Sequence, residues 1–401
     1  MQYNYNVRRD NSVYVNMRDP SFIKRYYRFK TLELIQKDEI AGSSPPDIFV
    51  GRIGYPNVFI GPLIPPQFGD TMVMGTPEQW VGKSIPEIVE YRSLLVRGMH
   101  KTKANSIDGR VEDMVRELAI ADKCTDVDAM LKYKPLLNVS FSENSQPFGP
   151  SAQLKEMSLG NTKANQKVEA AHFDTAMNAT KAMIELYEKG VLVSKIQKAL
   201  SSGAIGIRKN RKFVPTRWGI TAVDDTLSKY KLKTIKESKP IDSLMLFESV
   251  ALDNRWIIIL IPGEWEYESI EAWYPNTSWN PGGMAIDIGA SYEPYDGRKT
   301  YAEIGGCYYA ARLAVSELLD KLKSQAKVLI LREVHEGYIM PVGVWNVREH
   351  VRETLKGVPK NVASLKEATC MLRSQVCSYQ PTAQEFPLPS YLQIEEVLMA
   401  Q

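Results

Sequence analysis

A basic stretch with interleaved aromatic residues carries the most specific chemistry in this sequence. Its basic members are Arg208, Lys209, Arg211, Lys212 and Arg217, and its rings are Phe213 and Trp218. Arginine and lysine contact phosphate groups, and aromatic rings stack on bases. The pattern therefore predicts that these five basic residues bind nucleic acid. The alternative is a solvated loop between two helices whose charges bind nothing specific.

A second set of residues combines arginine, carboxylate and glycine in turn-like segments, the composition of a phosphate-binding cleft. Its members are Gly51, Arg52, Asp224, Asp225, Asp287, Glu293, Arg298, Lys299 and Glu303. Arginine can hold a phosphate through paired hydrogen bonds, and Glu293 or Glu303 would act as base or metal ligand. This alternative is an enzyme acting on a nucleotide or on damaged DNA. The competing interpretation of Arg217 beside Asp224 and Asp225 is a buried structural ion pair.

Other chemistries have little support in the sequence. It contains no P-loop, no dinucleotide-binding glycine motif and no nucleophile elbow. The four histidines are scattered, and Cys370 and Cys377 are too far apart for a zinc knuckle. We therefore predict no metal and no cofactor, with a divalent metal expected only under the enzyme alternative.

Charge is unevenly distributed along the chain, although the net charge is only +3. Residues 201–240 contain ten Lys or Arg and three acids, whereas residues 261–305 contain eight acids and two basic residues. The two segments predict one cationic and one anionic patch, or else two solvated faces. In the acidic segment Glu264, Glu266 and Glu268 alternate with Trp265 and Tyr267. This alternation favours a half-buried strand over a base-stacking metal site.

The elements that must position these residues are of both kinds. Strands are expected at 48–50, 58–60, 243–250, 255–261 and 328–331, and helices at 107–134, 165–189, 194–200, 221–228, 302–323 and 345–355. A further helix is expected after Ser84, which begins a capping box with Glu87. Lys229, Lys231 and Lys233 alternate with apolar residues, which predicts a strand with a lysine face.

These elements do not alternate regularly, so the predicted fold class is α+β, an irregular mixed α/β arrangement. With 401 residues we expect two intimately packed halves that divide near residue 200. The expected segments are an aromatic and basic N-terminal segment (1–41), an N-terminal half with a Gly/Pro-rich signature (42–200), a C-terminal α/β half (201–377) and a tail (378–401).

Composition places the chain among ordinary globular proteins, with 44% hydrophobic and 24% charged residues. Its longest apolar run, residues 256–261, is far too short to cross a membrane. Four cysteines do not make a disulfide framework. We therefore expect a cytoplasmic protein with no membrane contact.

Four segments of the sequence closely resemble the archaeal Nre DNA-repair family. They are GSSPPDIFVGR with the following GYP and GPL (residues 42–63), VPTRWGITAVDDT (214–226), YEPYDGRKTYAE (292–303) and PVGVWNVRE (341–349). These motifs are long and chemically unusual. The resemblance extends from about residue 42 to about residue 356.

The resemblance implies an accessory role in the repair of damaged DNA, with DNA and the sliding clamp as partners. It attaches no catalytic chemistry, so an adaptor that does not catalyse a reaction is a further alternative. Family members often begin with a cysteine-rich segment, but residues 1–41 contain no cysteine. Many end in a clamp-binding box, which survives here only in degenerate form at Tyr391, Ile394, Val397 and Leu398. This departure predicts weak clamp binding.

Overall fold

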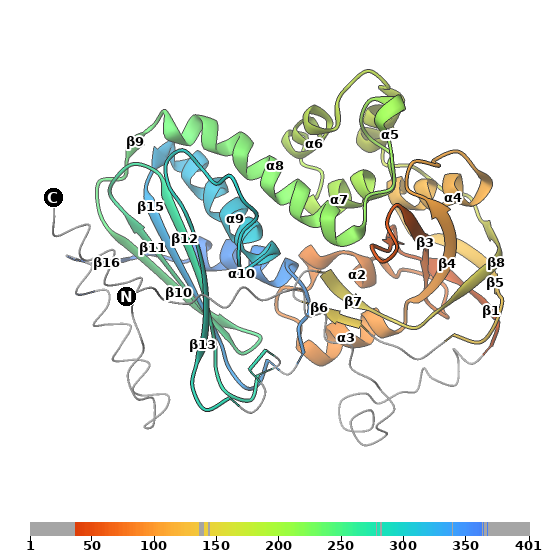
Figure 1. Cartoon of the computed structure of the whole chain (residues 1–401), viewed down its shortest axis with the longest axis horizontal. Coiled ribbons are helices and arrows are strands. Elements are labelled where there is room, and N and C mark those ends of the chain that lie inside the picture. The colour runs from red at the N-terminus through yellow and green to blue at the C-terminus, as the bar shows by residue number, and fades with distance from the viewer. Residues whose placement is uncertain are drawn as a thin grey trace.

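Two mixed β-sheets stand at opposite ends of the molecule, with helices between them (Figure 1). The computed structural model describes residues 37–135, 140–142, 145–277, 279–280, 283–338, 340–362, 364 and 367. Helices and sheets occur in irregular order, which confirms the predicted α+β fold class. Within the described residues, no helix has both the length and the apolar character that a bilayer span requires.

The N-terminal sheet has six strands. In spatial order they are β1 (Glu39–Ser44), β5 (Thr125–Leu131), β8 (Ser151–Leu159), β4 (Val96–Lys103), β3 (Asn57–Ile64) and β2 (Ile48–Val50). Strands β4 and β8 are parallel, and the other neighbours are antiparallel. One apolar face packs on α4 (Arg110–Ile120), which contributes Val115 and Leu118 to the core.

The two strands expected at 48–50 and 58–60 pair as the hairpin β2–β3, and its Gly/Pro-rich sequence has a structural reason. Gly54 closes the turn with a φ of +87°, a conformation that favours glycine. Further along β3, a Cβ atom on Gly61 would lie 1.5 Å from the carbonyl oxygen of Gly98. Gly98 lies on the neighbouring strand β4, so β3 and β4 can approach each other here only because position 61 has no side chain.

The C-terminal sheet also has six strands. In spatial order they are β13 (Asp287–Glu293), β12 (Glu266–Trp273), β15 (Lys327–Val334), β11 (Asn254–Ile261), β10 (Met245–Ala251) and β16 (Lys360–Asn361). Trp265 and Tyr267 are fully buried in the core beneath α9 (Gly306–Leu322) and α10 (Trp345–Lys356). The predicted alternation of buried aromatics with more accessible glutamates is thus confirmed.

A layer of helices joins the two sheets. It consists of α5 (Gln166–Phe173), α6 (Ala179–Glu188), α7 (Val193–Ser201) and α8 (Thr216–Lys236). These helices share one hydrophobic cluster that includes Ile196, Val223 and Leu313 of α9. Residue 200, the expected division between the halves, lies in α7, and the cluster continues across it into α8.

Three predicted elements are corrected. The helix expected at 165–189 is two helices, because Asp174 accepts hydrogen bonds from Ala176 and Met177 and Asn178 caps α6. The strand with a lysine face is wrong, because residues 229–233 lie in α8. The helix expected at 107–134 is α4 followed by strand β5, whose alternating burial marks it as a sheet strand.

The remaining elements are short except for α3 (Ile85–Ser93), which starts at the predicted capping box of Ser84 and Glu87. The short ones are α2 (Met72–Gly75), η1 (Pro77–Gln79), β6 (Ser140–Ser142), β7 (Ser145–Phe148), η2 (Arg208–Asn210), β9 (Lys239–Pro240) and β14 (Ser324–Gln325). Trp80, beside η1, packs edge-on against Trp345 of α10 with ring centroids 5.0 Å apart. This contact joins the N-terminal region to the C-terminal core.

Candidate nucleic-acid interface

Three loops that are distant in sequence meet beside the first turn of α8. The hairpin loop 51–57 contacts the loop 101–110 through a hydrogen bond from Ala104 N to Pro56 O (2.8 Å). The loop 208–218 joins them, since Phe213 N donates to Ala104 O (2.7 Å). Thr216, at the start of α8, accepts a hydrogen bond from Val50 N (3.0 Å). We call these three segments the basic loop surface.

The basic loop surface contains nine Lys or Arg residues and one acid, Asp108. Arg208, Lys209 and Lys212, which the sequence predicted, are exposed. The structure adds three exposed residues that sequence reasoning missed, Lys101, Lys103 and Arg110. A signal for two of them was present, because Lys101 and Lys103 alternate with Thr102 at the end of β4 and so share one face.

Arg211 is one of these nine basic residues, but it is buried and does not contribute to the exposed charge. Only 6% of it is exposed, and its guanidinium donates to the carbonyl oxygens of Gly206 (2.7 Å) and His172 (2.6 Å). The side chain therefore fixes the fold of the loop, and it has no accessible face for a phosphate. A loop has no regular periodicity that shows which side chains point inward. The sequence therefore could not distinguish Arg211 from its exposed neighbours.

Two of the predicted cations have acidic or aromatic neighbours. Arg208 pairs with Asp108 at 2.7 Å, but the side chains are 55% and 73% exposed. Such exposed pairs contribute at most about 1 kcal/mol, so a phosphate can compete for the arginine. Arg217 is half-buried and lies near Tyr301, on the loop that follows β13.

An aromatic ledge borders the basic loop surface. It consists of Tyr55 at the hairpin and Trp218 in the first turn of α8, with ring centroids 5.0 Å apart and planes inclined by 58°. Both residues are well exposed, at 40% and 45%. Tyr301 lies close to Thr221, one helical turn beyond Trp218. Segments from three of the four signature motifs therefore meet at the start of α8.

Three of the nine cleft candidates, Asp224, Asp225 and Glu293, lie elsewhere, in ion pairs with buried arginines. Asp224 is completely buried, and both its oxygens lie 3.0 Å from Arg348 Nη1. Burial raises the pKa of Asp224 to about 6, although Arg348 opposes the shift. Arg348 also binds Glu349 (3.0 Å). Asp224 therefore forms a buried structural ion pair, the alternative that the sequence offered for it. Its partner is Arg348, whereas the sequence had suggested Arg217.

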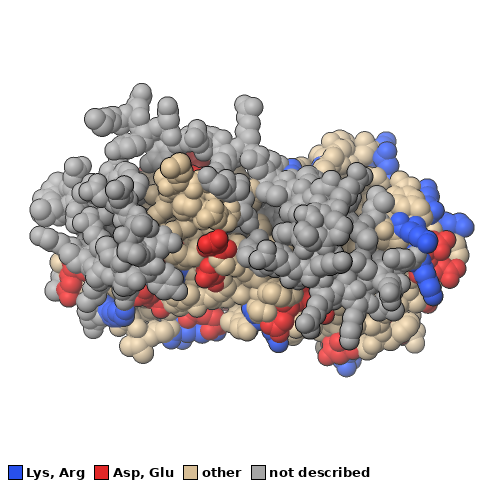
Figure 2. Space-filling model, turned by 90° about the horizontal axis from the view of Figure 1, so that it is seen from below, with Lys and Arg blue, Asp and Glu red and all other residues tan. Residues whose placement is uncertain are grey.

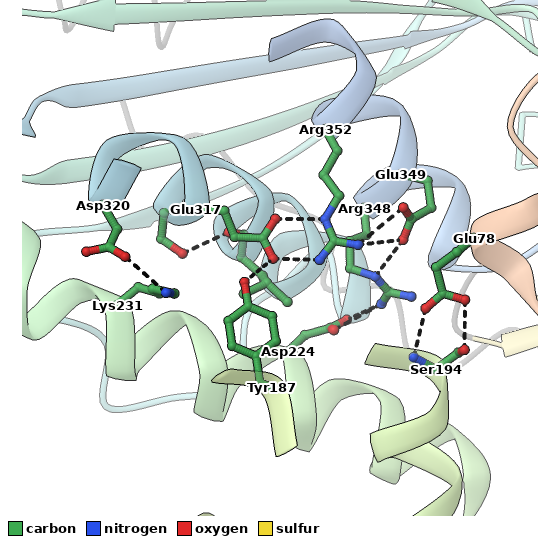
Figure 3. A network of polar contacts seen from close by, with 12 residues as sticks. Glu78, Tyr187, Ser194, Asp224, Lys231, Glu317, Asp320, Arg348, Glu349 and Arg352 are labelled. Atoms are coloured by element: carbon green, nitrogen blue, oxygen red, sulfur yellow. Dashed lines mark hydrogen bonds and ion pairs between the residues drawn. The ribbon is translucent and has the colours of Figure 1, made fainter. Parts of the chain in front are cut away.

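Figure 3 shows that this pair is part of a longer network between α6, α8, α9 and α10. Arg352 holds Glu317 through two hydrogen bonds of 2.6 and 2.7 Å, and Tyr187 donates to the same carboxylate at 2.6 Å. Lys231 of α8 reaches Asp320 of α9 at 3.0 Å. The network holds the helical layer to the C-terminal half.

Glu293 and Asp225 share one buried arginine, Arg312 of α9. Glu293 also accepts hydrogen bonds from Trp265 (3.1 Å) and Tyr308 (2.8 Å). With these buried donors around it, the carboxylate is held as the anion partner of Arg312 and is only 1% exposed. It has no access to a substrate, which a general base needs.

The remaining cleft candidates in the C-terminal half are Arg298, Lys299 and Glu303 on the loop after β13, and Asp287 at the start of that strand. Arg298 makes two hydrogen bonds of 2.7 Å to Glu303. Burial opposes ionisation of Glu303, but the hydrogen bonds from Arg298 and Ser291 hold its pKa below the ordinary value. Lys299 is exposed on the same loop. Asp287 begins β13 and Glu293 ends it, so these two carboxylates lie at opposite ends of one strand.

The hairpin candidates Gly51 and Arg52 do reach α8, through the loop that carries Tyr55. The carboxylates do not join them there, because Asp224, Asp225 and Glu293 are paired with buried arginines. Among the described residues, no group of three or more His, Cys, Asp or Glu could hold a metal ion.

A buried lysine marks another polar site inside the N-terminal half. Lys198 of α7 lies 3.7 Å from Asp47, which pairs with Arg92 at 2.8 Å. Burial lowers the pKa of Lys198. Lys198, Asp47 and Ser194 line a small pocket beneath the start of α8, and we assign them to packing between β2, α3 and α7.

The face seen from below carries acidic and basic side chains side by side (Figure 2). On that face Lys and Arg gather at the end that bears the N-terminal sheet. The charge on this face is therefore locally patterned, in keeping with a net charge of only +3 for the chain.

Family models described as archaeal Nre, N-terminal, and archaeal Nre, C-terminal, match residues 18–280 and 293–386. The chain belongs to the archaeal Nre family. The two matches are separated by residues 281–292, which hold most of β13, and β13 pairs with β12 of the N-terminal match in one sheet. The break between the matches therefore does not separate two structural units.

Two relatives show how closely the chain follows the family. DNA repair protein NreB of Archaeoglobus fulgidus is 40% identical over 331 residues, which are 82% of this chain and 83% of that protein. DNA repair protein NreA of Haloferax volcanii is 38% identical over 337 residues, which are 81% of this chain and 80% of that protein. No solved structure matches the chain.

Proposed function

We propose that this Nre family member is a DNA-repair accessory protein that binds nucleic acid through the basic loop surface. The names of its relatives support the repair role. The observation that supports binding is the meeting of three loops that together carry nine basic residues and one acid. Such a concentration of charge on one face is what a phosphate backbone requires.

The composition of the surface favours binding over catalysis. Its exposed cations and aromatic rings are accompanied by one carboxylate, Asp108, which pairs with Arg208. The carboxylates proposed as base or metal ligand are each held by an arginine away from this surface. Cations and rings position a nucleic acid, but they do not supply the proton acceptor of a hydrolytic reaction. The enzyme alternative therefore has no site among these residues.

The clamp partner stays a prediction. Tyr391, Ile394, Val397 and Leu398 lie outside the described residues, as do residues 1–36 of the N-terminal segment. The degenerate box still predicts weak binding to a sliding clamp. An adaptor role and nucleic-acid binding are compatible, because the tail and the basic loop surface are different parts of the chain.

The test replaces four exposed lysines of the surface, Lys101, Lys103, Lys209 and Lys212, by glutamine. We expect affinity for single- and double-stranded DNA to fall about tenfold or more at ~0.1 M salt. The slope of log affinity against log salt should fall by about 0.9 for each duplex phosphate that the variant no longer neutralises. Fluorescence anisotropy of labelled DNA measures both quantities.

The matched control neutralises four lysines at the other end of the chain, Lys321, Lys323, Lys356 and Lys360, which are also exposed. The change in total charge is the same in both variants. If the two variants lose affinity equally, the basic loop surface is not the binding site. If the intact protein binds no DNA even at low salt, the proposed function itself is wrong.

A further inference from the structure

We propose that the aromatic ledge of Tyr55 and Trp218 stacks on unpaired bases, so that single-stranded nucleic acid is the preferred ligand. The proposal rests on the proposed function, because the basic loop surface supplies the phosphate contacts. It goes further by naming the form of nucleic acid and the residues that select it.

The first argument is the exposure of Trp218. The chain contains seven tryptophans, and the other six are buried or half-buried in the described structure. Trp218 is 45% exposed although it stands in the first turn of a helix with apolar neighbours. An indole ring of this size normally goes into the core or an interface. Its position on the surface is therefore explained if a planar ligand covers it.

The second argument is the way the ring is held. Tyr55 contacts Trp218 from the side, and Tyr55 itself lies in a tight hairpin turn. The turn is closed by hydrogen bonds from Tyr55 N to Arg52 O (3.3 Å) and from Asn57 N to Gly54 O (2.9 Å). At its tip Ile53 is 70% exposed. A rigid turn that presents apolar and aromatic groups loses little conformational entropy when it binds.

The third argument is the position of the ledge relative to the cations. Asn57, two residues after Tyr55, lies opposite Lys103 across the β3–β4 pair. Lys212 lies in the loop that leads into α8 and Trp218, and it directly precedes Phe213, whose N–H donates to Ala104 O. Lysines therefore flank the rings at a distance of a few residues. A strand whose phosphates meet these lysines can place its bases on the rings.

Stacking on a ledge distinguishes single strands from duplexes for a geometric reason. In a duplex each base face is covered by its neighbours, so the rings can contact only a terminal or displaced base. In a single strand the faces are accessible, and each base stacked on an aromatic ring is worth ~1–3 kcal/mol. Charge alone gives no such discrimination, since both forms carry phosphates.

Tyr301 extends the ledge along α8. It is 55% exposed and lies close to Thr221, one helical turn beyond Trp218. A strand that leaves Trp218 along the helix therefore meets a second exposed ring. This arrangement suits a run of several unpaired bases.

The binding experiment compares an oligodeoxythymidine with a duplex of the same length, using the full chain. We expect the protein to bind the oligodeoxythymidine more tightly, and Trp218→Ala to weaken that binding about fivefold or more. Duplex binding by the same variant should change less than about twofold. Tyr55→Ala should act in the same direction.

Tyr133→Ala is the matched control. Tyr133 is 41% exposed, like Tyr55, but it follows β5, whose end lies beside the start of β8 at the opposite end of the N-terminal sheet. Its removal should leave both affinities unchanged. An equal loss in the control would mean that any exposed ring contributes, which would overturn the assignment of the ledge.

A second readout detects stacking directly. Oligodeoxythymidine should quench the intrinsic tryptophan fluorescence, and Trp218→Phe should abolish the quenching while retaining most of the affinity. If Trp218→Ala leaves affinity and fluorescence change intact while the lysine variant loses binding, the ledge proposal is wrong and the proposed function stands. If neither probe binds the intact protein, both are wrong.

Discussion

Individual charged residues of this protein fall into two populations that the sequence does not separate. Arg92, Arg312, Arg332 and Arg348 are at most 2% exposed, and each contacts a carboxylate. Lys101, Lys103, Lys209 and Lys212 are exposed. In these eight residues the division matches side-chain chemistry, because the planar and weakly hydrated guanidinium tolerates burial with a paired carboxylate better than the compact ammonium does. Lys198, buried beside Asp47, departs from it.

Glu268 provides a prediction at the scale of one residue. It lies on β12 opposite Tyr292 and Leu329, and burial raises its pKa to about 7 from an ordinary 4.5. Between these values the native state holds a proton that the unfolded chain has lost. The contribution of Glu268 to stability therefore declines as pH rises from about 4.5 to about 7, and stays low above that.

Glu268→Gln should remove this decline. We expect the free energy of unfolding of the variant to change less than that of the parent between about pH 5 and about pH 8. Urea unfolding at several pH values measures the free energy of unfolding of both proteins. Glu264→Gln, at an exposed position just before the same strand, should keep the parent's pH dependence. Parallel pH profiles for parent and Glu268→Gln would contradict the prediction.

At the scale of elements, α8 organises the molecule. Its first turn receives the hairpin loop, its middle carries Asp224 and Asp225, and its later turns carry Lys231. The sequence predicted only residues 221–228 as helix, because Pro215 and the lysine alternation obscured both ends. The helix extends beyond these residues because tertiary contacts stabilise its first and last turns.

Arg348→Ala tests the buried pair that connects α8 with α10. Removing the arginine leaves Asp224 buried without its partner, so the free energy of unfolding should fall by about 3–5 kcal/mol. Lys83→Ala breaks an ion pair whose side chains are 39% and 43% exposed, and it should cost at most about 1 kcal/mol. Denaturant unfolding compares the two. Equal effects would show that the buried pair contributes no more than a surface pair.

At the scale of the whole molecule, the two sheets are parts of one packed structure. Helices α7 and α8 share a cluster with Leu313 of α9, and Trp80 packs on Trp345. Asp224 and Arg348 join the same regions through charge. We therefore expect the described halves to unfold together.

Calorimetry tests this cooperativity. The parent should show a single unfolding transition, and Trp80→Ala should shift it to lower temperature without splitting it, because removal of a fully buried tryptophan costs about 3–5 kcal/mol. Trp218→Ala, at an exposed position, should shift the midpoint far less. Two separate transitions in the parent would contradict the prediction.

Local patterns in the sequence determined much of the secondary structure. The hairpin at 48–60, the capped helix after Ser84 and the strands near 245–261 needed only turn chemistry, capping and apolar alternation. Alternation with glutamates likewise sufficed to predict the burial of Trp265 and Tyr267. Each of these signals involves residues a few positions apart, which is the range over which propensity and periodicity act.

The site was decided by contacts between residues far apart in the chain, and no local pattern reports on those. Only the tertiary structure brought Tyr55 to Trp218 and added Lys101 and Lys103 to the basic loop surface. The tertiary structure also buries Arg211 and pairs Asp224 with Arg348. Burial depends on what the rest of the chain packs around a residue, so identical side chains a few positions apart acquired opposite roles.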